Sequence, residues 1–458
     1  VIGDVDGTTA SNPNKGIQVT YSATIGDYDL SAVSYLSIAA NKTLAGQLNL
    51  QTNGELKTSG DGHYIGDIAL AGGKFSATDN QVLGGTLSIT ADSELTVSDN
   101  YTLTLSQSGG LALGANTLTL SGGGSLVSGG LTLNDPSSKL LLNSITVDNV
   151  STSANSLGLD VDNNSTITAL SVANITPVAI ASGSSLLGGI TVSAGSLKLN
   201  ETGTLASTIA MSGGVLDADE SSTVSGALSH TADITIDVAD NKTLTYSGAP
   251  FSLGAYTLTL TGGGTLMSGG LNLNNANSKL LLNSITVDSV STTIDNSLGV
   301  DVDNDSTITS LSVANITPVS IASGKTLSGA ITLTAGSVKL NETGTIASTV
   351  EMSGGTLDAD ESLTISGALT QSGDTTIDVL ANKTLTYSGA PLSLGANTLT
   401  MSGGGTLSNT NALVLNNADS LLSLAGIVTI GNVKATDNAT SGKGIQVVES
   451  ATLGSFDL

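Results

Sequence analysis

The chain has 458 residues, and its charge excludes several classes of partner. Its 13 basic residues, all Lys, stand against 38 Asp and Glu, which gives a formal net charge of −25. Nucleic acid and acidic membrane surfaces are poor partners, because neutralising phosphate groups requires clusters of Lys and Arg. No apolar run reaches the roughly 18 residues of a membrane-spanning helix, so we expect no transmembrane segment. Cys and Trp are both absent, so no disulfide can stabilise the chain, and its redox compartment stays open.

The end of the chain repeats its beginning. Residues 430–458 match residues 2–30 without a gap, at a shift of 428 positions; Gly444–Val447, for example, repeats Gly16–Val19. Self-similarity at a fixed period indicates a repeat architecture. We therefore expect one period of a head-to-tail array, with termini that cut through a longer rod.

A shorter period lies inside the first. Lys139–Asp148 recurs verbatim at Lys279–Asp288, a shift of 140, and other segments recur at 140 or 141. The internal units are 111–250, 251–391, and 392–458 continuing in phase with 31–110. The sequence thus predicts one continuous solenoid over residues 1–458, because a fixed repeat favours a stack over separate domains.

The shortest period is about 20 residues, and it predicts the local structure. Examples from the first unit are residues 117–126, 156–168, 196–205 and 233–244. Each begins with an apolar-x-apolar strand signal, continues through a turn rich in Gly, Asn, Asp and Ser, and reaches a second short apolar segment. Alternation with period two indicates strands with one buried face. No helix is expected, because turn residues interrupt every apolar run.

One such coil has no second layer to cover its apolar side chains, so the coils must stack. We predict an all-β fold, a right-handed parallel β-helix of roughly 23 coils, in which Leu, Ile, Val and Ala form columns along a narrow core.

Three acidic runs resemble calcium loops because their carboxylates lie two residues apart. They begin at Asp160, at Asp301 and at Asp4. None continues to the bidentate Glu of an EF-hand, so we favour solenoid corners and keep calcium as a weak alternative.

Other motifs also have a structural interpretation. Ser323–Thr326 resembles the end of a phosphate-binding loop, but position 319 is Val and no helix follows. Gly122–Gly124 and Gly262–Gly264 suit sharp corners. His63 and His230 have no repeated catalytic neighbourhood. The carboxylates Asp217, Asp219 and Glu220 recur as Asp358, Asp360 and Glu361, whereas a glycosidase pair would occur once.

Sequons for N-glycosylation are frequent. They include those at Asn41, Asn100, Asn174, Asn200, Asn241, Asn315, Asn341 and Asn382. Because Asn, Ser and Thr are abundant in turns, we interpret them as turn residues.

The coils at residues 115–126 and 197–205 resemble those of bacterial surface proteins with parallel β-helical stalks, namely autotransporter passengers and filamentous-haemagglutinin-like adhesins. The resemblance covers essentially the whole chain. It implies an exported structural or adhesive role, and no ligand-binding residues carry over from it.

We therefore expect no enzyme, with no catalytic, cofactor-binding or metal-binding residues. The hypothesis is a structural repeat segment of a long extracellular or cell-surface fibre or adhesin stalk, of bacterial origin. Its partners would be further copies or repeats of itself, end to end, and cell-surface glycans or other cells. One alternative is a β-helical protein that binds or degrades polysaccharide, although Arg and Trp are absent. A second alternative is an ice- or mineral-binding solenoid, which would need the same short residue on successive coils.

Overall fold

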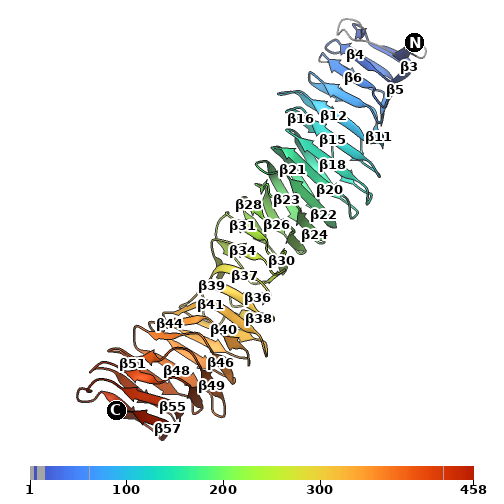
Figure 1. Ribbon diagram of the computed structural model, residues 1–458. Helices are drawn as coiled ribbons and strands as arrows, with labels where there is room; N and C mark the ends of the chain where they lie inside the picture. Colours follow the sequence, from blue (N-terminus) through green and yellow to red (C-terminus); the bar gives the residue numbers. More distant parts are fainter. Residues whose placement is uncertain (1–4, 8–15, 61, 427, 458) are drawn as a thin grey trace. The chain divides into compact units, whose positions relative to one another are not determined.

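The computed structural model describes residues 5–7, 16–60, 62–426 and 428–457, and it is built of strands alone (Figure 1). These residues form a parallel β-solenoid of about 22 turns, spaced about 20 residues apart, and they contain no helix. The predicted fold class is confirmed, with about 22 turns in place of 23. The chain consists of two compact units, residues 1–231 and residues 232–458.

In unit 1 (residues 1–231), one strand of each turn belongs to a single ladder, which we call the first face. Its strands, in chain order, are β2 (Ile17–Val19), β4 (Val33–Ile38), β6 (Glu55–Ser59), β9 (Lys74–Ala77), β12 (Ser93–Val97), β15 (Thr117–Ser121), β18 (Lys139–Asn143), β20 (Gly158–Asn163), β22 (Ile175–Ile180), β24 (Ser196–Leu199) and β27 (Val215–Ala218).

The other strands of unit 1 form the second and third faces. They are β1 (Val5–Gly7), β3 (Ala23–Leu30), β5 (Thr43–Gln51), β7 (His63–Tyr64), β8 (Asp67–Ala71), β10 (Gln81–Leu83), β11 (Leu87–Ala91), β13 (Thr102–Leu105), β14 (Leu111–Ala112), β16 (Ser125–Val127), β17 (Leu131–Leu133), β19 (Thr146–Thr152), β21 (Ser165–Val172), β23 (Ser185–Val192), β25 (Thr204–Leu205), β26 (Thr208–Met211), β28 (Ser222–Val224) and β29 (Leu228–His230).

Unit 2 (residues 232–458) repeats this plan. Its first face consists of β30 (Ile234–Val238), β33 (Thr257–Thr261), β36 (Lys279–Asn283), β38 (Gly299–Val302), β40 (Ile316–Ile321), β42 (Ser337–Leu340), β45 (Thr356–Ala359), β48 (Thr375–Val379), β51 (Thr398–Ser402), β54 (Leu421–Leu424) and β56 (Gly444–Val447).

Its second and third faces consist of β31 (Thr243–Tyr246), β32 (Phe251–Ser252), β34 (Thr265–Met267), β35 (Leu271–Leu273), β37 (Thr286–Thr292), β39 (Ser306–Val313), β41 (Thr326–Leu333), β43 (Thr345–Ile346), β44 (Thr349–Met352), β46 (Leu363–Ile365), β47 (Leu369–Gln371), β49 (Thr384–Tyr387), β50 (Leu392–Ser393), β52 (Thr406–Asn409), β53 (Leu413–Leu415), β55 (Val428–Ala435) and β57 (Ala451–Asp457).

Three strand segments make up a turn, and each pairs in parallel with the equivalent segment of the next turn. β15 pairs with β18, whereas β16 and β17 pair with the first and second parts of β19. The longer strands, such as β19, therefore run across two faces. Backbone donors and acceptors are satisfied between turns, which is the arrangement that a stacked repeat requires.

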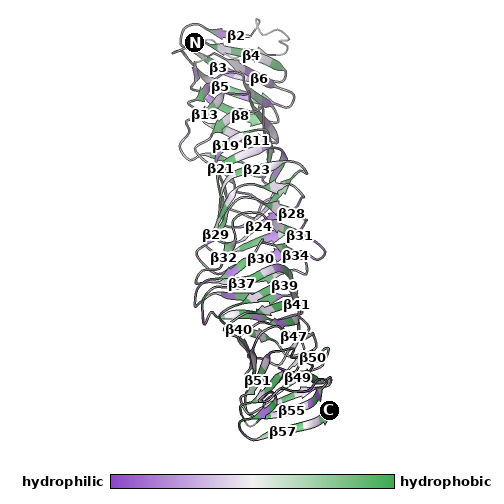
Figure 2. Ribbon diagram, turned by 90° about the vertical axis from the view of Figure 1, so that its left-hand side faces the viewer, coloured by the Kyte–Doolittle hydropathy of each residue, from purple (hydrophilic) through white to green (hydrophobic). Residues whose placement is uncertain are grey.

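The core consists of columns of aliphatic side chains, as predicted. On the first face of unit 1, one column runs through Leu95, Leu120, Leu142 and Val161, which pair in register. Each of these side chains is at most 1% exposed. The strands alternate between apolar and polar residues, which is visible as alternating green and purple (Figure 2). Period-two alternation with stacked inner positions gives a closely packed interior, which also holds a few buried aromatic rings such as that of Phe75.

Glycine is required at the corners where the backbones of two turns meet. Gly158 begins β20 with φ of +83°, and a Cβ there would lie 1.9 Å from the carbonyl oxygen of Pro177. Gly299 has the same φ at the equivalent corner of unit 2. Any other residue would combine an unfavourable backbone conformation with a collision.

Candidate functional site

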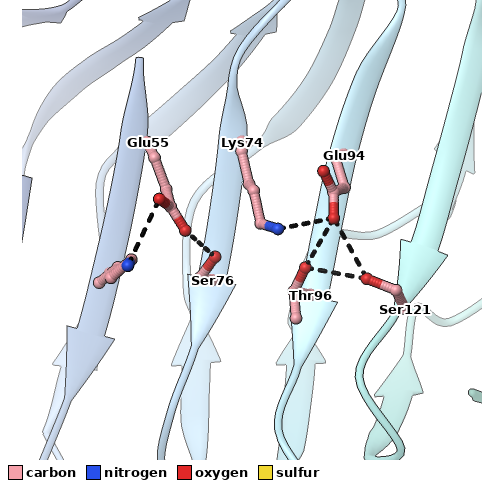
Figure 3. A network of polar contacts seen from close by, with 7 residues as sticks. Glu55, Lys74, Ser76, Glu94, Thr96 and Ser121 are labelled. Atoms are coloured by element: carbon pink, nitrogen blue, oxygen red, sulfur yellow. Dashed lines mark hydrogen bonds and ion pairs between the residues drawn. The ribbon is translucent and has the colours of Figure 1, made fainter. Parts of the chain in front are cut away.

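Two polar networks lie side by side on the first face of unit 1, where Glu55, Lys74 and Glu94 occupy paired positions on three successive strands (Figure 3). One network contains Glu55, and the other contains Lys74 and Glu94. The Lys74 Nζ lies 2.7 Å from Glu94 Oε1. Ser76 donates a hydrogen bond of 2.8 Å to Glu55, whose other oxygen lies 3.5 Å from Lys57 Nζ. Parallel pairing in register thus places opposite charges next to each other on the outer surface.

The Glu94 carboxylate accepts further hydrogen bonds from its own strand and from the next turn. Thr96 donates to Glu94 Oε1 at 3.0 Å, and Ser121 donates to it at 3.2 Å (Figure 3). Partial burial raises the pKa of Glu94, but Lys74, Thr96 and Ser121 outweigh it and hold the pKa below its ordinary value. A carboxylate stabilised in this way is a poor general acid, which must hold its proton near neutral pH.

An open groove of about 470 Å³ lies beside this network. Its lining residues are Val33, Asn53, Gly54, Glu55, Gly72, Gly73, Lys74, Asp92, Ser93, Glu94, Thr117 and Thr119. Asp92 is engaged as well, because its carboxylate accepts a hydrogen bond of 2.7 Å from the Thr117 backbone N–H. The groove presents hydrogen-bonding groups to solvent, and those groups also hold successive turns together.

The same pairing of Lys with an acidic residue about one turn away recurs along both units. The pairs are Lys139–Asp160 at 2.9 Å, Lys198–Asp217 at 3.2 Å, Lys198–Asp219 at 3.1 Å, Lys279–Asp301 at 2.6 Å, Lys339–Asp358 at 3.4 Å and Lys339–Asp360 at 3.6 Å. Opposite charges about one turn apart in the sequence therefore indicate these ion pairs, although no motif contains them. Their recurrence favours a role in joining turns.

The expected corner position is wrong for Asp160 and Asp301, which lie on the first-face strands β20 and β38. The runs then continue into the turns that follow these strands. Asp160 and Asp301 belong to the ion pairs above, and Asn164 accepts a hydrogen bond of 2.9 Å from the Ser185 backbone N–H. Asp305 accepts one of 2.8 Å from Thr326 in the equivalent turn of unit 2. In the part of the chain that the structure describes, no group of three or more His, Cys, Asp or Glu could hold a metal ion. The run beginning at Asp4 lies outside the residues whose side chains are described.

The paired carboxylates considered as a glycosidase site lie on equivalent strands of the two units. Asp217 is on β27 and Asp358 is on β45. Burial and the neighbouring charge of Asp360 raise the pKa of Asp358 against the opposing effect of Lys339. Because Asp358 pairs in register with Asp378, two carboxylates lie side by side on adjacent strands. Glu361 forms an ion pair of 2.6 Å with Lys383 instead of joining them.

The phosphate-loop-like segment is a corner. Residues 323–325 lie in the turn between β40 and β41, where the Lys325 backbone N–H donates to Ala322. The triple-glycine segments also form corners, and Gly122 and Gly123 have φ of +108° and +80°.

The two imidazoles lie on different turns of unit 1. His63 is exposed on β7, and His230 ends β29.

Several sequon asparagines occupy turn positions with positive φ. These are Asn41, Asn100, Asn241 and Asn382, with φ between 60° and 65°. The Lys242 backbone N–H then closes the turn on the carbonyl of Ala239, and Lys383 does the same on Leu380. Asn tolerates the left-handed conformation better than most other residues with side chains, which explains its recurrence at these turn positions.

Strands β19, β21, β23, β26 and β29 of unit 1 carry a column of short outward-facing residues. Ser151, Ser171, Thr191, Ala210 and Ser229 pair in succession. The residue type changes from turn to turn, so the identical short residues that an ice- or mineral-binding face would need do not recur here.

In two further contacts, which the sequence did not reveal, a partly buried carboxylate caps a glycine corner. Asp148 accepts a hydrogen bond of 2.7 Å from the Ser128 hydroxyl and one of 2.9 Å from the Gly129 backbone N–H. Asp288 makes the same contacts with Ser268 and Gly269 in unit 2, both at 2.8 Å. Partial burial raises the pKa of both carboxyls, but these donors hold it below the ordinary value. Asp148 and Asp288 end the verbatim decapeptide, which was the available signal.

Replacing Asp148 with Asn is expected to destabilise the chain at pH 7 by about 1 kcal/mol, because a charge-assisted acceptor is lost. A depressed carboxyl pKa stabilises the fold above the unfolded-state value of about 3.9 and loses that effect as pH falls through the folded-state value. The difference between native chain and variant should therefore shrink below about pH 4. Urea unfolding at pH 7 and pH 3 measures it. The exposed Asp162→Asn is the control, and an equal loss at both pH values would contradict the role of the charge.

No protein-family model, curated protein or solved structure matches this chain. Among the described residues, no helix has the length and apolar character that crossing a membrane requires.

Proposed function

We propose that this chain is a structural repeat segment of a long extracellular or cell-surface fibre or adhesin stalk, and that it performs no catalysis. The fibre lengthens by head-to-tail continuation of solenoid turns, so further repeats of the same sequence are its principal partners. The resemblance of residues 115–126 and 197–205 to bacterial β-helical stalks supports export to the cell surface. The formal net charge of −25 keeps such a fibre soluble and discourages side-by-side association.

The observation that carries the proposal is the equivalence of successive turns. On the first face of unit 1, Leu95, Leu120 and Leu142 pair in register on successive strands, and each is at most 1% exposed. In unit 2, β33 pairs with β36 in the register in which β15 pairs with β18. Each turn thus offers the next one the same backbone pairing and the same core column, which is what a fibre that lengthens by repeats requires.

The fibre lengthens by stacking of turns, without any chemical step. Within each unit, a turn forms its backbone hydrogen bonds with the turns before and after it, and its apolar residues extend the same columns. Addition of another repeat therefore requires no new fold, only continuation in register. The ion pairs one turn apart and the Asp148 and Asp288 caps fix that register on the outside of the solenoid.

A fusion chain tests the proposal directly. Residues 1–458 are followed without a linker by residues 31–458 of a second copy, which continues the 428-residue period. We expect electron microscopy to show one thin particle of about twice the length of the single chain, because stacked strands add about 4.8 Å per turn. The backbone amides of β56 and β57 should become as protected from hydrogen exchange as those of β2 and β3.

The matched control joins residue 458 to residue 41 instead, which breaks the phase by about half a turn. It should leave the amides of β56 and β57 as exchangeable as in the single chain. The proposal fails if the in-phase fusion shows that same fast exchange, or if it forms two bodies connected by a flexible segment.

A further inference from the structure

We infer that the peptide bond between Asp135 and Pro136 is a self-cleavage site, which the carboxyl group of Asp135 cuts in mildly acidic solution. The bond lies in the turn between β17 and β18, residues 134–138, which we call the Asp-Pro turn. Cleavage is one event within the chain itself, and no separate substrate takes part. The inference goes beyond the proposed function and does not depend on it.

The bond after Asp135 is the one bond in the sequence that joins an acidic residue to a Pro. The other Pro residues follow Asn12, Thr176, Ala249, Thr317 and Ala390. A peptide bond before Pro is a tertiary amide, so its nitrogen, once protonated, leaves as a secondary amine. An Asp side chain is also long enough for its carboxyl group to reach the carbonyl carbon of the same residue. Both groups that cleavage requires therefore meet at this bond.

The atoms of the step balance with water as the co-reactant. Asp135 Oδ2 attacks the Asp135 carbonyl carbon and closes a cyclic anhydride, while the C–N bond to Pro136 breaks. The carboxyl proton passes to the Pro136 nitrogen. A water molecule then opens the anhydride, which leaves one fragment that ends with Asp135 and another that begins with the Pro136 amine.

Two backbone N–H groups of the turn hold the reacting groups. The Ser138 N–H donates a hydrogen bond of 3.0 Å to the Asp135 carbonyl oxygen, where negative charge develops during the attack. The Ser137 N–H donates one of 2.9 Å to Asp135 Oδ1, which keeps the carboxyl group folded back toward the backbone. Held in this way, the carboxyl group attacks without first losing the freedom of a flexible chain.

The Asp-Pro turn is itself fixed to the preceding turn. The Ser138 hydroxyl, which is fully buried, accepts a hydrogen bond of 3.0 Å from the Asp135 N–H and donates one of 2.6 Å to the Gly114 carbonyl. The Asn134 side chain accepts one of 2.8 Å from the Gly114 N–H. Pro136 is exposed, so water reaches the bond.

No ion pair draws the Asp135 carboxyl group away from the bond. Residues 113–116 and 153–157, which belong to the turns packed against the Asp-Pro turn, include no charged side chain. The adjoining Lys139 lies 2.9 Å from Asp160.

The same turn occurs twice in unit 2 without the Asp-Pro bond, because its two central residues are Asn275–Ala276 and Asn417–Ala418. In both, the Asn Oδ1 accepts a hydrogen bond of 2.9 Å from the N–H two residues later. The Asn carbonyl accepts one from the Ser N–H three residues later, at 2.9 Å from Ser278 and at 3.0 Å from Ser420. The turns thus share their hydrogen bonds and differ in the two groups that react, so unit 2 supplies matched controls.

The cut leaves the solenoid assembled. Strand β17 stays paired with β14 and β19, and β18 stays paired with β15 and β20. Residues 1–135 and 136–458 are then held together by strand pairing and core packing alone. Cleavage therefore makes this corner the point at which a pulled rod separates.

Incubation of the full chain at about pH 4 tests the inference, because part of the Asp carboxyl groups of a protein carry their proton there. Denaturing electrophoresis and mass spectrometry should show fragments 1–135 and 136–458, whose masses together exceed that of the chain by one water. Size exclusion without denaturant should show one particle of unchanged size. The same chain unfolded in urea at the same pH is the reference. The folded chain should cleave at least about tenfold faster, because the turn orients the reacting groups.

Variants that exchange residues between equivalent turns keep the fold and move the chemistry. Asp135→Asn removes the attacking carboxyl group, and Pro136→Ala restores an ordinary amide, so each should leave unit 1 intact. The double variant Asn275→Asp with Ala276→Pro should add a cut after residue 275. Circular dichroism at about pH 4 checks that each variant stays folded.

The inference is overturned if the folded chain cleaves no faster than the unfolded one, if either single variant cleaves as the native chain does, or if the double variant gains no cut. The fusion chain that tests the proposed function is studied at neutral pH, so its result is independent of these outcomes.

Discussion

Deleting residues 251–391 is expected to leave a folded solenoid that is shorter by one repeat. The deletion lies within unit 2 and joins Pro250 to Leu392, which in the intact chain follows the identical decapeptide Asn382–Pro391. Strand β31 then continues into β50, and its Thr243 and Leu244 meet the partners that Thr384 and Leu385 have in β52. Each repeat contacts its neighbours alone, so removal of a whole repeat restores an equivalent contact. Circular dichroism per residue and cooperative urea unfolding measure the outcome.

The control deletion removes residues 251–381, so it takes out about half a turn less than the first deletion. The segment Asn241–Pro250 is then followed directly by its second copy, Asn382–Pro391. The strand after this duplication is therefore displaced by half a turn and meets the wrong face of the turn before it. Because a shift of register turns core side chains toward solvent, this variant should lose cooperative unfolding. If both deletions unfold alike, the predicted repeat units do not describe how the chain folds.

The second large effect is expected from Leu142→Ala, which should destabilise unit 1 by about 2–5 kcal/mol. Leu142 is fully buried on β18 between Leu120 and Val161 of the adjacent turns. Its removal leaves a cavity that two neighbouring strands cannot close without losing their own register. The free energy of urea unfolding measures the loss.

Leu141→Ala is the matched control, because Leu141 is the next residue on the same strand and faces outward. It should cost less than about 1 kcal/mol. Leu282→Ala should repeat the large effect in β36, whose sequence is the same. A similar loss at Leu141 and Leu142 would show that the alternation of inner and outer positions is wrong.

For the repeated decapeptide Lys139–Asp148, the sequence predicted the structure but not the contacts of its side chains. Its verbatim recurrence predicted equivalent structure at Lys279–Asp288, and β33 indeed pairs with β36 in the register in which β15 pairs with β18. The role of Asp148 could not be predicted, because its partners Ser128 and Gly129 lie one turn away and belong to no motif. The Lys139–Asp160 ion pair was also missed, although opposite charges at one-turn spacing were visible.

The sequence by itself determined that the chain consists of strands and turns, that the turns recur about every 20 residues, and that their aliphatic positions form the core. These properties follow from local periodicity, because alternation and turn chemistry act within a few residues. Only the tertiary structure decided which side chains meet between turns, such as Lys74 with Glu94 and Asp148 with Gly129. The separation of paired residues varies from 25 for Leu95 and Leu120 to 19 for Leu142 and Val161, so the pairing is fixed only when the strands stack and the core columns align.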